Sequence, residues 1–210
     1  MRAFKNPAAR KVALAGSVAA LGLLLSACGS DGDSMSGMDH GGKTSASASP
    51  SPSTSASFND ADVTFAQGMI PHHQQALEMA KLADGRAEDS EVKKIVAAIE
   101  KAQDPEIGTM KSWLKSWGKP ESAGQGGHGG HGTAAGMMSD QDMKDLRSLK
   151  GKAFDRKFAE LMIAHHEGAV EMARTEQKDG SDATAKKLAD DVVRTQSAEI
   201  AELRKILDRL

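Results

Sequence analysis

Two pairs of adjacent histidines, each set between methionines, are the residues of this 210-residue sequence best suited to chemistry. Thioether sulfur is a soft ligand that favours Cu(I), whereas imidazole accepts Cu(I), Cu(II), zinc and nickel. Mixed His/Met sites without cysteine therefore indicate copper, in either oxidation state, before zinc or nickel. The candidate ligands are Met69, His72, His73 and Met79 in the first set and Met162, His165, His166 and Met172 in the second.

Both sets belong to an internal repeat with an offset of 93 residues. Residues 65–80 align with residues 158–173 without a gap, and the offset extends to residues on either side. Such a repeat predicts the architecture, because each copy is one supersecondary unit that packs against the other. The matched positions outside the central motif include Asp62 with Asp155, Gln103 with Gln196, Glu106 with Glu199 and Ile107 with Ile200.

Each copy is predicted to form two amphipathic helices, from the spacing of apolar residues and from capping and stop signals. Pro71 by itself should break the first helix, because proline lacks an amide donor and clashes with the preceding turn. Its repeat partner Ala164 indicates that the helix continues, so we expect a kink near Gly68–Pro71. Two helical hairpins joined by a long connection predict an all-α fold, a four-helix bundle. The expected helices run from Asn59 or Asp60 to about Asp84, from Asp89 or Ser90 to about Trp117, from about Lys152 to Asp179, and from Ser181 or Asp182 to the C-terminus.

The second helix of each copy carries polar residues on a face that should be buried: Gln103 and Glu106, then Gln196 and Glu199. A buried carboxylate needs a partner, and histidine across the hairpin is the candidate, directly or through a shared metal. Adjacent histidines diverge by about 100° on a helix. We therefore expect each ring to find its partners within its own hairpin, among Met on its own helix and Gln or Glu on the next, which gives two such units. The alternative is a hydrogen-bonded layer that fixes the helix register while the methionines fill gaps.

The N-terminus predicts export and a lipid anchor. A basic start precedes the apolar stretch 12–24, which is too short for a membrane span of about 20 residues. Leu25-Ser26-Ala27-Cys28 resembles a lipobox, so lipidated Cys28 should tether the chain to the outer face of the cell membrane or in the periplasm. Cys28 is the only cysteine, which leaves the mature chain without a thiolate ligand.

Two low-complexity segments flank the first copy and hold the other histidines. A histidine or methionine in a flexible Gly-rich segment has no packing role. We therefore expect additional metal ligands outside the helices: Met35, Met38, His40, His128, His131, Met137 and Met138. The expected organisation is a signal peptide (1–27), a lipidated cysteine and tether (28–57), the first hairpin (58–118), a Gly/His-rich connection with a short helix between Ser139 and Lys150 (119–152), and the second hairpin (153–210).

The pattern F-x-x-x-M-I-x-H-H-x-x-A-x-x-M-A, followed by Q-x-x-E-I, resembles the bacterial domain-of-unknown-function 305 family over about residues 60–210. The resemblance implies a ferritin-like helical bundle that is often exported and often lipid-anchored. It also implies, for some members, a link to copper binding or copper resistance through His and Met side chains. One departure between the two copies is Gly168, which stands where the first copy has Gln75.

These observations favour a membrane-tethered metal-binding protein, most simply a copper protein, over two alternatives. The first is a structural or interaction bundle without metal. The second is a di-metal ferritin-like oxidase, which needs Glu-x-x-His on two helices. In this sequence the residues three positions before the four paired histidines are Met69, Ile70, Met162 and Ile163. The motif is therefore absent, and we do not expect an enzyme. The net charge of −2, without a basic stripe, argues against a nucleic-acid partner.

Overall fold

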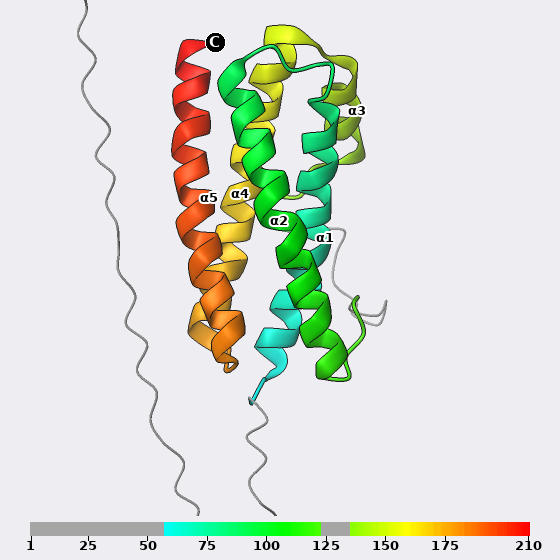
Figure 1. Cartoon of the computed structure of the whole chain (residues 1–210), viewed down its shortest axis with the longest axis vertical. Coiled ribbons are helices and arrows are strands. Elements are labelled where there is room, and N and C mark those ends of the chain that lie inside the picture. Colours follow the sequence, from blue (N-terminus) through cyan, green and yellow to red (C-terminus); the bar gives the residue numbers. More distant parts are fainter. Residues whose placement is uncertain (1–56, 123–134) are drawn as a thin grey trace, which may run out of the picture. The chain divides into compact units, whose positions relative to one another are not determined.

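The computed structural model of the chain describes residues 57–122 and 135–210, and every regular element in these two stretches is a helix. The all-α class predicted from the sequence is therefore confirmed. Figure 1 shows long helices and one short helix, α3, which lies in the connection between the two long pairs. The helices are α1 (Asp60–Leu82), α2 (Ser90–Ser116), α3 (Asp140–Ser148), α4 (Gly151–Asp179) and α5 (Ala183–Arg209).

The helices begin where the sequence places polar caps. The side chains of Asn59, Asp89, Ser139 and Asp182 accept hydrogen bonds from first-turn amides, which otherwise have no partner within the helix. Asn59 and Ser139 are completed as capping boxes by an aspartate three residues later. The expected helix starts agree with these caps to within a residue or so, and the short helix expected after Ser139 is present as α3.

The first helix continues through Pro71, as the repeat partner Ala164 indicated. α1 runs without interruption from Asp60 to Leu82, with Pro71 exposed on its outer side. The neighbours of Pro71, Ile70 and His72, are buried. Their packing outweighs the one hydrogen bond that proline cannot donate, which is a tertiary override of a local preference.

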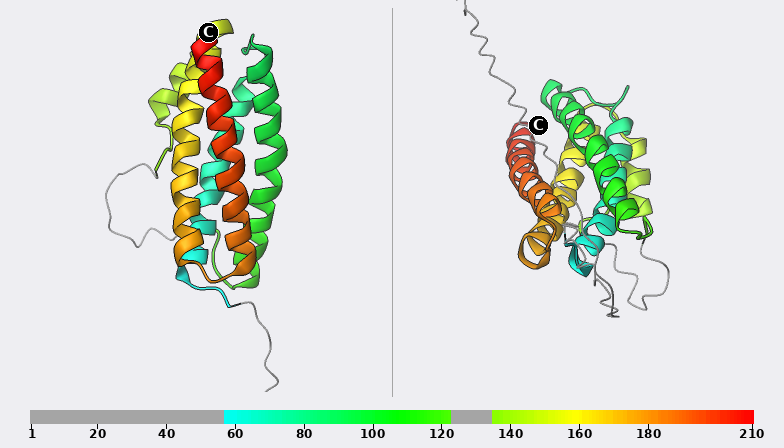
Figure 2. Two further views of the ribbon diagram at one scale, coloured as in Figure 1. Left: turned by 90° about the vertical axis from the view of Figure 1, so that its left-hand side faces the viewer. Right: turned by 60° about the horizontal axis from the view of Figure 1, so that its bottom comes forward.

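The long helices form two hairpins, α1 with α2 and α4 with α5, which contact each other mainly through α1 and α4. Figure 2 shows α5 beside α4 and α2, with the axes of the long helices close to parallel. α1 and α4 run in opposite directions: Met79 near the end of α1 belongs to the same apolar cluster as Phe154 at the start of α4. α3 rests against both α1 and α4.

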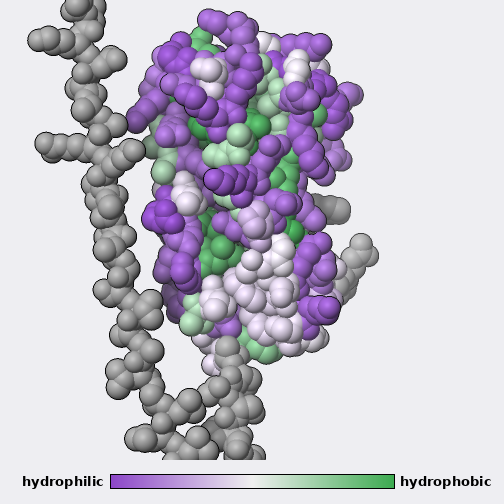
Figure 3. Space-filling model, in the orientation of Figure 1, coloured by the Kyte–Doolittle hydropathy of each residue, from purple (hydrophilic) through white to green (hydrophobic). Residues whose placement is uncertain are grey.

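Buried apolar side chains form two clusters that lie at different levels along the long helices. One cluster holds the later parts of α1 and α5 with the earlier parts of α2 and α4, and the other holds the complementary parts. Figure 3 shows that the face carrying α2 is mainly hydrophilic, with apolar areas between the helices. Between the two clusters every long helix carries polar residues at one level, which places a polar layer inside the protein.

Two buried aspartates join the hairpins. Asp155 on α4 accepts hydrogen bonds from the amides of Glu88 (3.2 Å) and Asp89 (2.8 Å), just before α2. Its repeat partner Asp62 on α1 accepts from the amides of Ser181 and Asp182, just before α5, at 3.1 and 2.9 Å. The first helix of each hairpin therefore binds the main chain just before the N-terminus of the other hairpin's second helix. The helix dipole strengthens such carboxylate–amide contacts.

The Asp62 junction also contains the buried carboxyl group of Glu176. Glu176 is 1% exposed, and neither of its oxygens accepts a hydrogen bond from a donor group of the described residues. Burial and, to a smaller extent, the neighbouring Asp62 together raise the pKa of Glu176 to about 8. Burial opposes ionisation of Asp62 as well, but the neighbouring Glu176 and hydrogen bonds from the Asn59 and Asp182 amides lower its pKa overall. Glu176 is thus a neutral acid at pH 7 beside the carboxylate of Asp62.

Replacement of Glu176 by glutamine is expected to stabilise the protein increasingly as the pH rises. The folded pKa of about 8 lies above the ordinary value of 4.5, so the folded state holds a proton that the unfolded state releases in this window. Stability is therefore lost with rising pH, by at most about 1.4 kcal/mol per pH unit. Glu176→Gln keeps a neutral side chain of similar size beside Asp62 and removes this loss. Urea denaturation at pH 5 and pH 8 measures the effect, with the exposed Glu160→Gln as control; an equal gain at both pH values would contradict it.

Candidate metal site

The polar layer consists of matching residues from all four long helices. α1 and α4 each contribute their histidine pair, and α2 and α5 each contribute a glutamine and a glutamate. All four histidine side chains are fully buried, and the two glutamines are 2% and 3% exposed. The eight residues are His72, His73, Gln103 and Glu106 from the first hairpin and His165, His166, Gln196 and Glu199 from the second.

One histidine of each pair is hydrogen-bonded to the glutamate of its own hairpin. The His73 Nε2 atom lies 2.7 Å from Glu106 Oε2, and the His166 Nε2 atom lies 2.8 Å from Glu199 Oε2. The sequence-based expectation of a carboxylate opposite a histidine is confirmed for these two residues. The carboxylates are 18% and 17% exposed, so each links a buried ring to solvent.

The other two histidines do not pair within their hairpins. His72 of α1 and His165 of α4 pack against each other, with ring centroids 3.7 Å apart and planes tilted by 39°. The expectation that each ring finds its partners on its own hairpin is therefore wrong for His72 and His165. Adjacent residues on a helix diverge, so when His73 and His166 turn toward α2 and α5, the preceding rings turn toward the α1–α4 contact.

The packed rings are held neutral by their surroundings. Burial lowers the pKa of His72 to about 3, and the neighbouring His73 adds to this effect. Burial lowers the pKa of His165 to about 2, with further contributions from His72 and His166. A neutral imidazole keeps a lone pair on one ring nitrogen, which is the form that binds metal ions.

Hydrogen-bond acceptors decide which ring nitrogen keeps that lone pair. A carboxylate or carbonyl oxygen can only accept, so the ring nitrogen facing it carries the proton. His73 and His166 face carboxylates with Nε2, and His72 faces the carbonyl oxygen of Ala135 with Nε2, at 3.2 Å. In the neutral form of each of these rings, Nδ1 is therefore the nitrogen that carries the lone pair. Nδ1 is buried without a partner in all four histidines, and His165 has no partner at Nε2 either.

The methionines beside the histidines lie on both sides of the polar layer. Met79 and Met162 belong to one apolar cluster, and Met69 belongs to the other, against which Met172 packs. Each side thus holds one sulfur from each hairpin, not two from the same hairpin. The sequence grouped Met69 and Met79 with His72 and His73 of the same helix, whereas the fold places Met69 and Met79 in different clusters, each with a methionine of α4.

Gln103 and Gln196 were also expected to partner the histidines. Both are buried as predicted, but their side-chain oxygens lie without a hydrogen-bond partner. In residues 57–122 and 135–210, no three His, Cys, Asp or Glu side chains converge on a point where they could hold a metal ion. The contacts that the described fold makes within the layer are the His73–Glu106 and His166–Glu199 pairs and the meeting of His72 with His165.

The predicted lipidation site and most of the ligands predicted in the low-complexity segments lie outside the described residues. They are Cys28, Met35, Met38, His40, His128 and His131. Met137 and Met138 are described and are half-buried. Met138 packs against an apolar cluster, and its main chain is hydrogen-bonded to Gln75. The expectation that Met138 lies in a flexible segment without a packing role is therefore wrong.

A groove of about 710 Å³ runs between α2 and α5 on the side away from the packed rings. It is lined by apolar residues such as Ile95 and Ile206 and by charged residues that include Glu199. Because Glu199 also binds His166, the groove leads from solvent to the polar layer. Among the helices of the described residues, none is both long and apolar enough to cross a membrane.

The fold and the site define an all-helical protein with a buried imidazole layer between two apolar clusters. Residues 62–207 match the family model of a domain of unknown function, DUF305, and the chain belongs to this family. The crystal structure of a DUF305 protein from Streptomyces coelicolor, named as a candidate secreted protein, is similar at 33% identity and a TM-score of 0.66, over 71% of this chain and 93% of that one. A DUF305 fragment from Deinococcus radiodurans matches at 30% identity and a TM-score of 0.64, over 72% and 98% of the two chains.

Structures of a third protein, CopM, are also similar. CopM in its Cu(II)-bound form is 37% identical, with a TM-score of 0.62, over 70% of this chain and 96% of CopM. CopM in its Cu(I)-bound form is 34% identical, with a TM-score of 0.59, over 70% and 96% of the two chains. A silver-bound form of CopM is similar as well. No curated protein sequence matches this chain.

Proposed function

We propose that the protein is a membrane-tethered, extracytoplasmic copper-binding protein that holds the ion within its histidine layer. The observation that carries this proposal is the set of buried ring nitrogens without hydrogen-bond partners: Nδ1 of His72, His73, His165 and His166, and Nε2 of His165. A buried polar atom without a partner costs about 1–3 kcal/mol of stability. A ligand that uses these lone pairs explains why the fold keeps them.

The donor types favour copper. Thioether sulfur is soft and binds Cu(I) well, and imidazole binds both oxidation states of copper. Each of the two apolar clusters that flank the layer contains methionines from both hairpins, Met79 and Met162 in one and Met69 with Met172 in the other. The related CopM has been crystallised with Cu(II), Cu(I) and silver, and silver is also a soft monovalent ion. Zinc and nickel are secondary candidates for the imidazole nitrogens.

The residues would act on the ion as ligands and as groups that orient ligands. Glu106 and Glu199 hold His73 and His166 by Nε2, which orients each ring and raises the basicity of Nδ1. The packed rings of His72 and His165 would supply a donor from each hairpin. Copper is then cargo, and the protein is a binding protein that we do not expect to be an enzyme.

The finer features of the fold and location belong to the same proposal. We infer that the two hairpins are copies of one unit in a ferritin-like four-helix bundle, because residues 93 positions apart make equivalent contacts: His73–Glu106 with His166–Glu199, and Asp62 with Asp155. The lipobox-like sequence ending at Cys28 supports a lipid anchor, and the Streptomyces relative named as a candidate secreted protein supports export.

Addition of Cu(I) to the metal-free protein is expected to raise the melting temperature. An ion that binds only the folded state stabilises it by RT ln(1 + [L]/Kd), about 4 kcal/mol at a free concentration 1,000 times Kd. For a fold of this size that is a shift of roughly 10 °C. Thermal unfolding with buffered Cu(I), Ag(I), Zn(II) and Ni(II) measures the effect and ranks the ions. A melting temperature unchanged by every ion would refute the proposal and leave the layer with a structural role only.

A further inference from the structure

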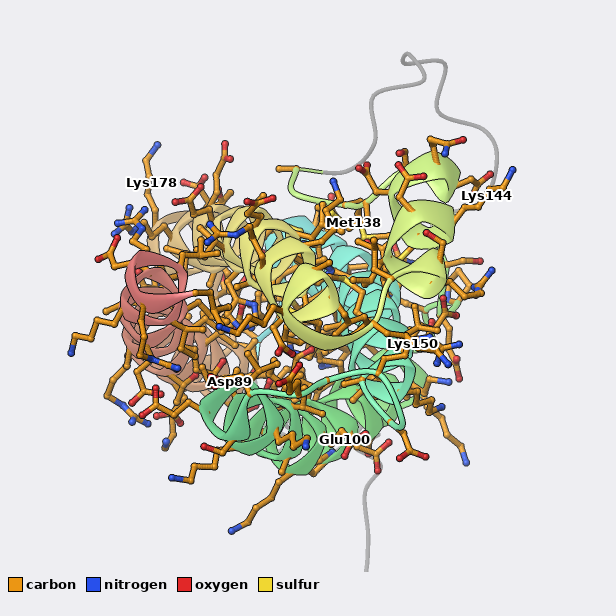
Figure 4. The ribbon with its side chains drawn as sticks, turned by 90° about the horizontal axis from the view of Figure 1, so that it is seen from above. Asp89, Glu100, Met138, Lys144, Lys150 and Lys178 are labelled. Carbon is orange, nitrogen blue, oxygen red and sulfur yellow. The ribbon has the colours of Figure 1, made fainter. Side chains whose placement is uncertain are left out.

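A short strap, residues 135–138, crosses the outside of the α1–α4 contact and covers the packed histidines. The carbonyl oxygen of Ala135 at its start lies 3.2 Å from His72 Nε2. Met138 at its end packs against an apolar cluster. Figure 4 shows Met138 beside α1 and α4, on the opposite side of the protein from α2. The strap is therefore in contact with the polar layer on the face away from the groove.

Gln75 binds the strap from α1. Its side-chain amide donates to the carbonyl oxygen of Met138 at 2.9 Å, and its side-chain oxygen accepts from the Met138 amide at 2.7 Å. This two-point contact satisfies both main-chain groups of Met138 at once. It fixes the position of the strap along α1, one helical turn from His72.

Glycines allow the strap to lie close to α4. A Cβ atom on Gly168 would lie 2.0 Å from the Ala135 carbonyl oxygen and 2.8 Å from the Gly136 Cα atom, which are main-chain atoms. Gly136 has a φ of 78°, and a Cβ atom there would lie 2.6 Å from the Ala164 carbonyl oxygen. A side chain at position 168 would therefore force the strap away from α4. Position 168 is the repeat partner of Gln75, so the two copies differ where the strap crosses them.

We propose that the strap is part of the metal site: the Ala135 carbonyl holds His72 in the Nε2–H tautomer, which leaves His72 Nδ1 as a ligand, while Gln75 and Gly168 position the strap. This inference rests on the proposed copper function. It gives His72 the same arrangement that Glu106 gives His73, with a main-chain oxygen in place of a carboxylate. Outer groups of this kind orient ligand histidines in metal sites.

The strap also makes the two copies unequal. His72 has an oxygen acceptor at Nε2, whereas its repeat partner His165 has no partner at either ring nitrogen. One face of the packed pair is thus preset for a metal and the other is free to adjust. We expect one tight copper ion shared between the hairpins, not two equivalent ions with one in each hairpin.

The test compares Gln75→Ala and Gly168→Ala with the wild type and with Gly108→Ala. Gly108 is an exposed glycine inside α2, and a Cβ atom there meets nothing within 4 Å, so this control makes the same change in a helix without touching the strap. In metal-free protein, nitrogen NMR of the histidine rings should show His72 as Nε2–H in the wild type and the control. Both strap variants should show a mixture of tautomers and about 10-fold faster exchange of the Met138 amide.

The affinity for Cu(I) is the second measurement of this test. Competition for Cu(I) with a chromophoric chelator should show about 10- to 100-fold weaker binding in both strap variants and no change in the control. Unaltered affinity in variants whose strap exchanges faster would overturn the role of the strap and leave the proposed function standing. Unaltered Met138 exchange in both variants would overturn the roles of Gln75 and Gly168. A wild type that does not bind Cu(I) would overturn the proposed function, and this inference with it.

Discussion

Replacement of His165 by leucine is expected to weaken Cu(I) binding by at least about 100-fold while leaving the metal-free protein as stable as the wild type or about 1 kcal/mol more stable. His165 is fully buried, and neither ring nitrogen has a hydrogen-bond partner. Burial of such a group opposes folding, and an apolar side chain of similar size removes that cost. Loss of a ligand should exceed the 10- to 100-fold effect typical of groups that only orient ligands.

The neighbouring residue provides a matched control with the opposite expectation for stability. His166 is equally buried but forms the 2.8 Å hydrogen bond with Glu199. His166→Leu leaves that carboxylate, only 17% exposed, without its partner and should cost about 2 kcal/mol. Both substitutions remove one imidazole from the same turn of α4, so their difference isolates the value of the hydrogen bond.

Urea denaturation of metal-free protein and chelator competition for Cu(I) separate the two readings of the layer. A metal site predicts that His165→Leu loses affinity without losing stability, which is the usual trade-off at a functional site. A structural layer predicts a loss of stability in both variants and no copper-dependent stabilisation in the wild type. The second pattern would rule out a binding role for His165.

Replacement of Asp155 by alanine should destabilise the protein by about 3 kcal/mol, the largest loss expected from a single residue outside the apolar clusters. Asp155 is fully buried and accepts the amides of Glu88 and Asp89 at the entrance to α2. The substitution leaves these amides without an acceptor and removes a favourable charge at a helix start. Asp155→Asn keeps one acceptor oxygen and should lose about half as much.

Asp62→Ala is the matched comparison, because Asp62 makes the equivalent contacts with the amides of Ser181 and Asp182. Its loss should be smaller, since Asp62 also raises the pKa of the buried Glu176, and its removal relieves part of that strain on folding. The gap between the two variants should widen from pH 5 to pH 8. Urea denaturation at both pH values measures it, and equal losses for Asp62→Ala and Asp155→Ala at pH 8 would contradict the asymmetry of the two junctions.

Local chemistry allowed the helices and half of the layer to be predicted from the sequence. Cap residues such as Asn59 and Asp182 satisfy amides within their own turn, so their effect can be read from a few neighbouring residues. The pairing of His73 with Glu106 could be predicted because a short hairpin brings two amphipathic faces together in one register. The continuation of α1 through Pro71 could be predicted from the repeat partner Ala164, although proline by itself favours a break.

The repeat also contained signals whose meaning the sequence could not supply. Asp62 and Asp155 were visible as a matched pair, but their role in joining the hairpins depends on which helix entrance each one reaches. The difference between Gln75 and Gly168 was visible too, and only the fold shows that the strap crosses both positions. The Ala135 carbonyl gave no signal at all, because a main-chain oxygen is the same in every residue.

The histidine pairs separate what the sequence determined from what the tertiary structure decided. The sequence alone established two copies of a His-His motif set between methionines, each on a helix that must bury it. Only the tertiary structure decided that His72 and His165 meet each other and that each apolar cluster receives sulfurs from both hairpins. The physical reason is that periodicity fixes the face of a helix on which a side chain lies, whereas the crossing of α1 and α4 is set by the packing of the whole core.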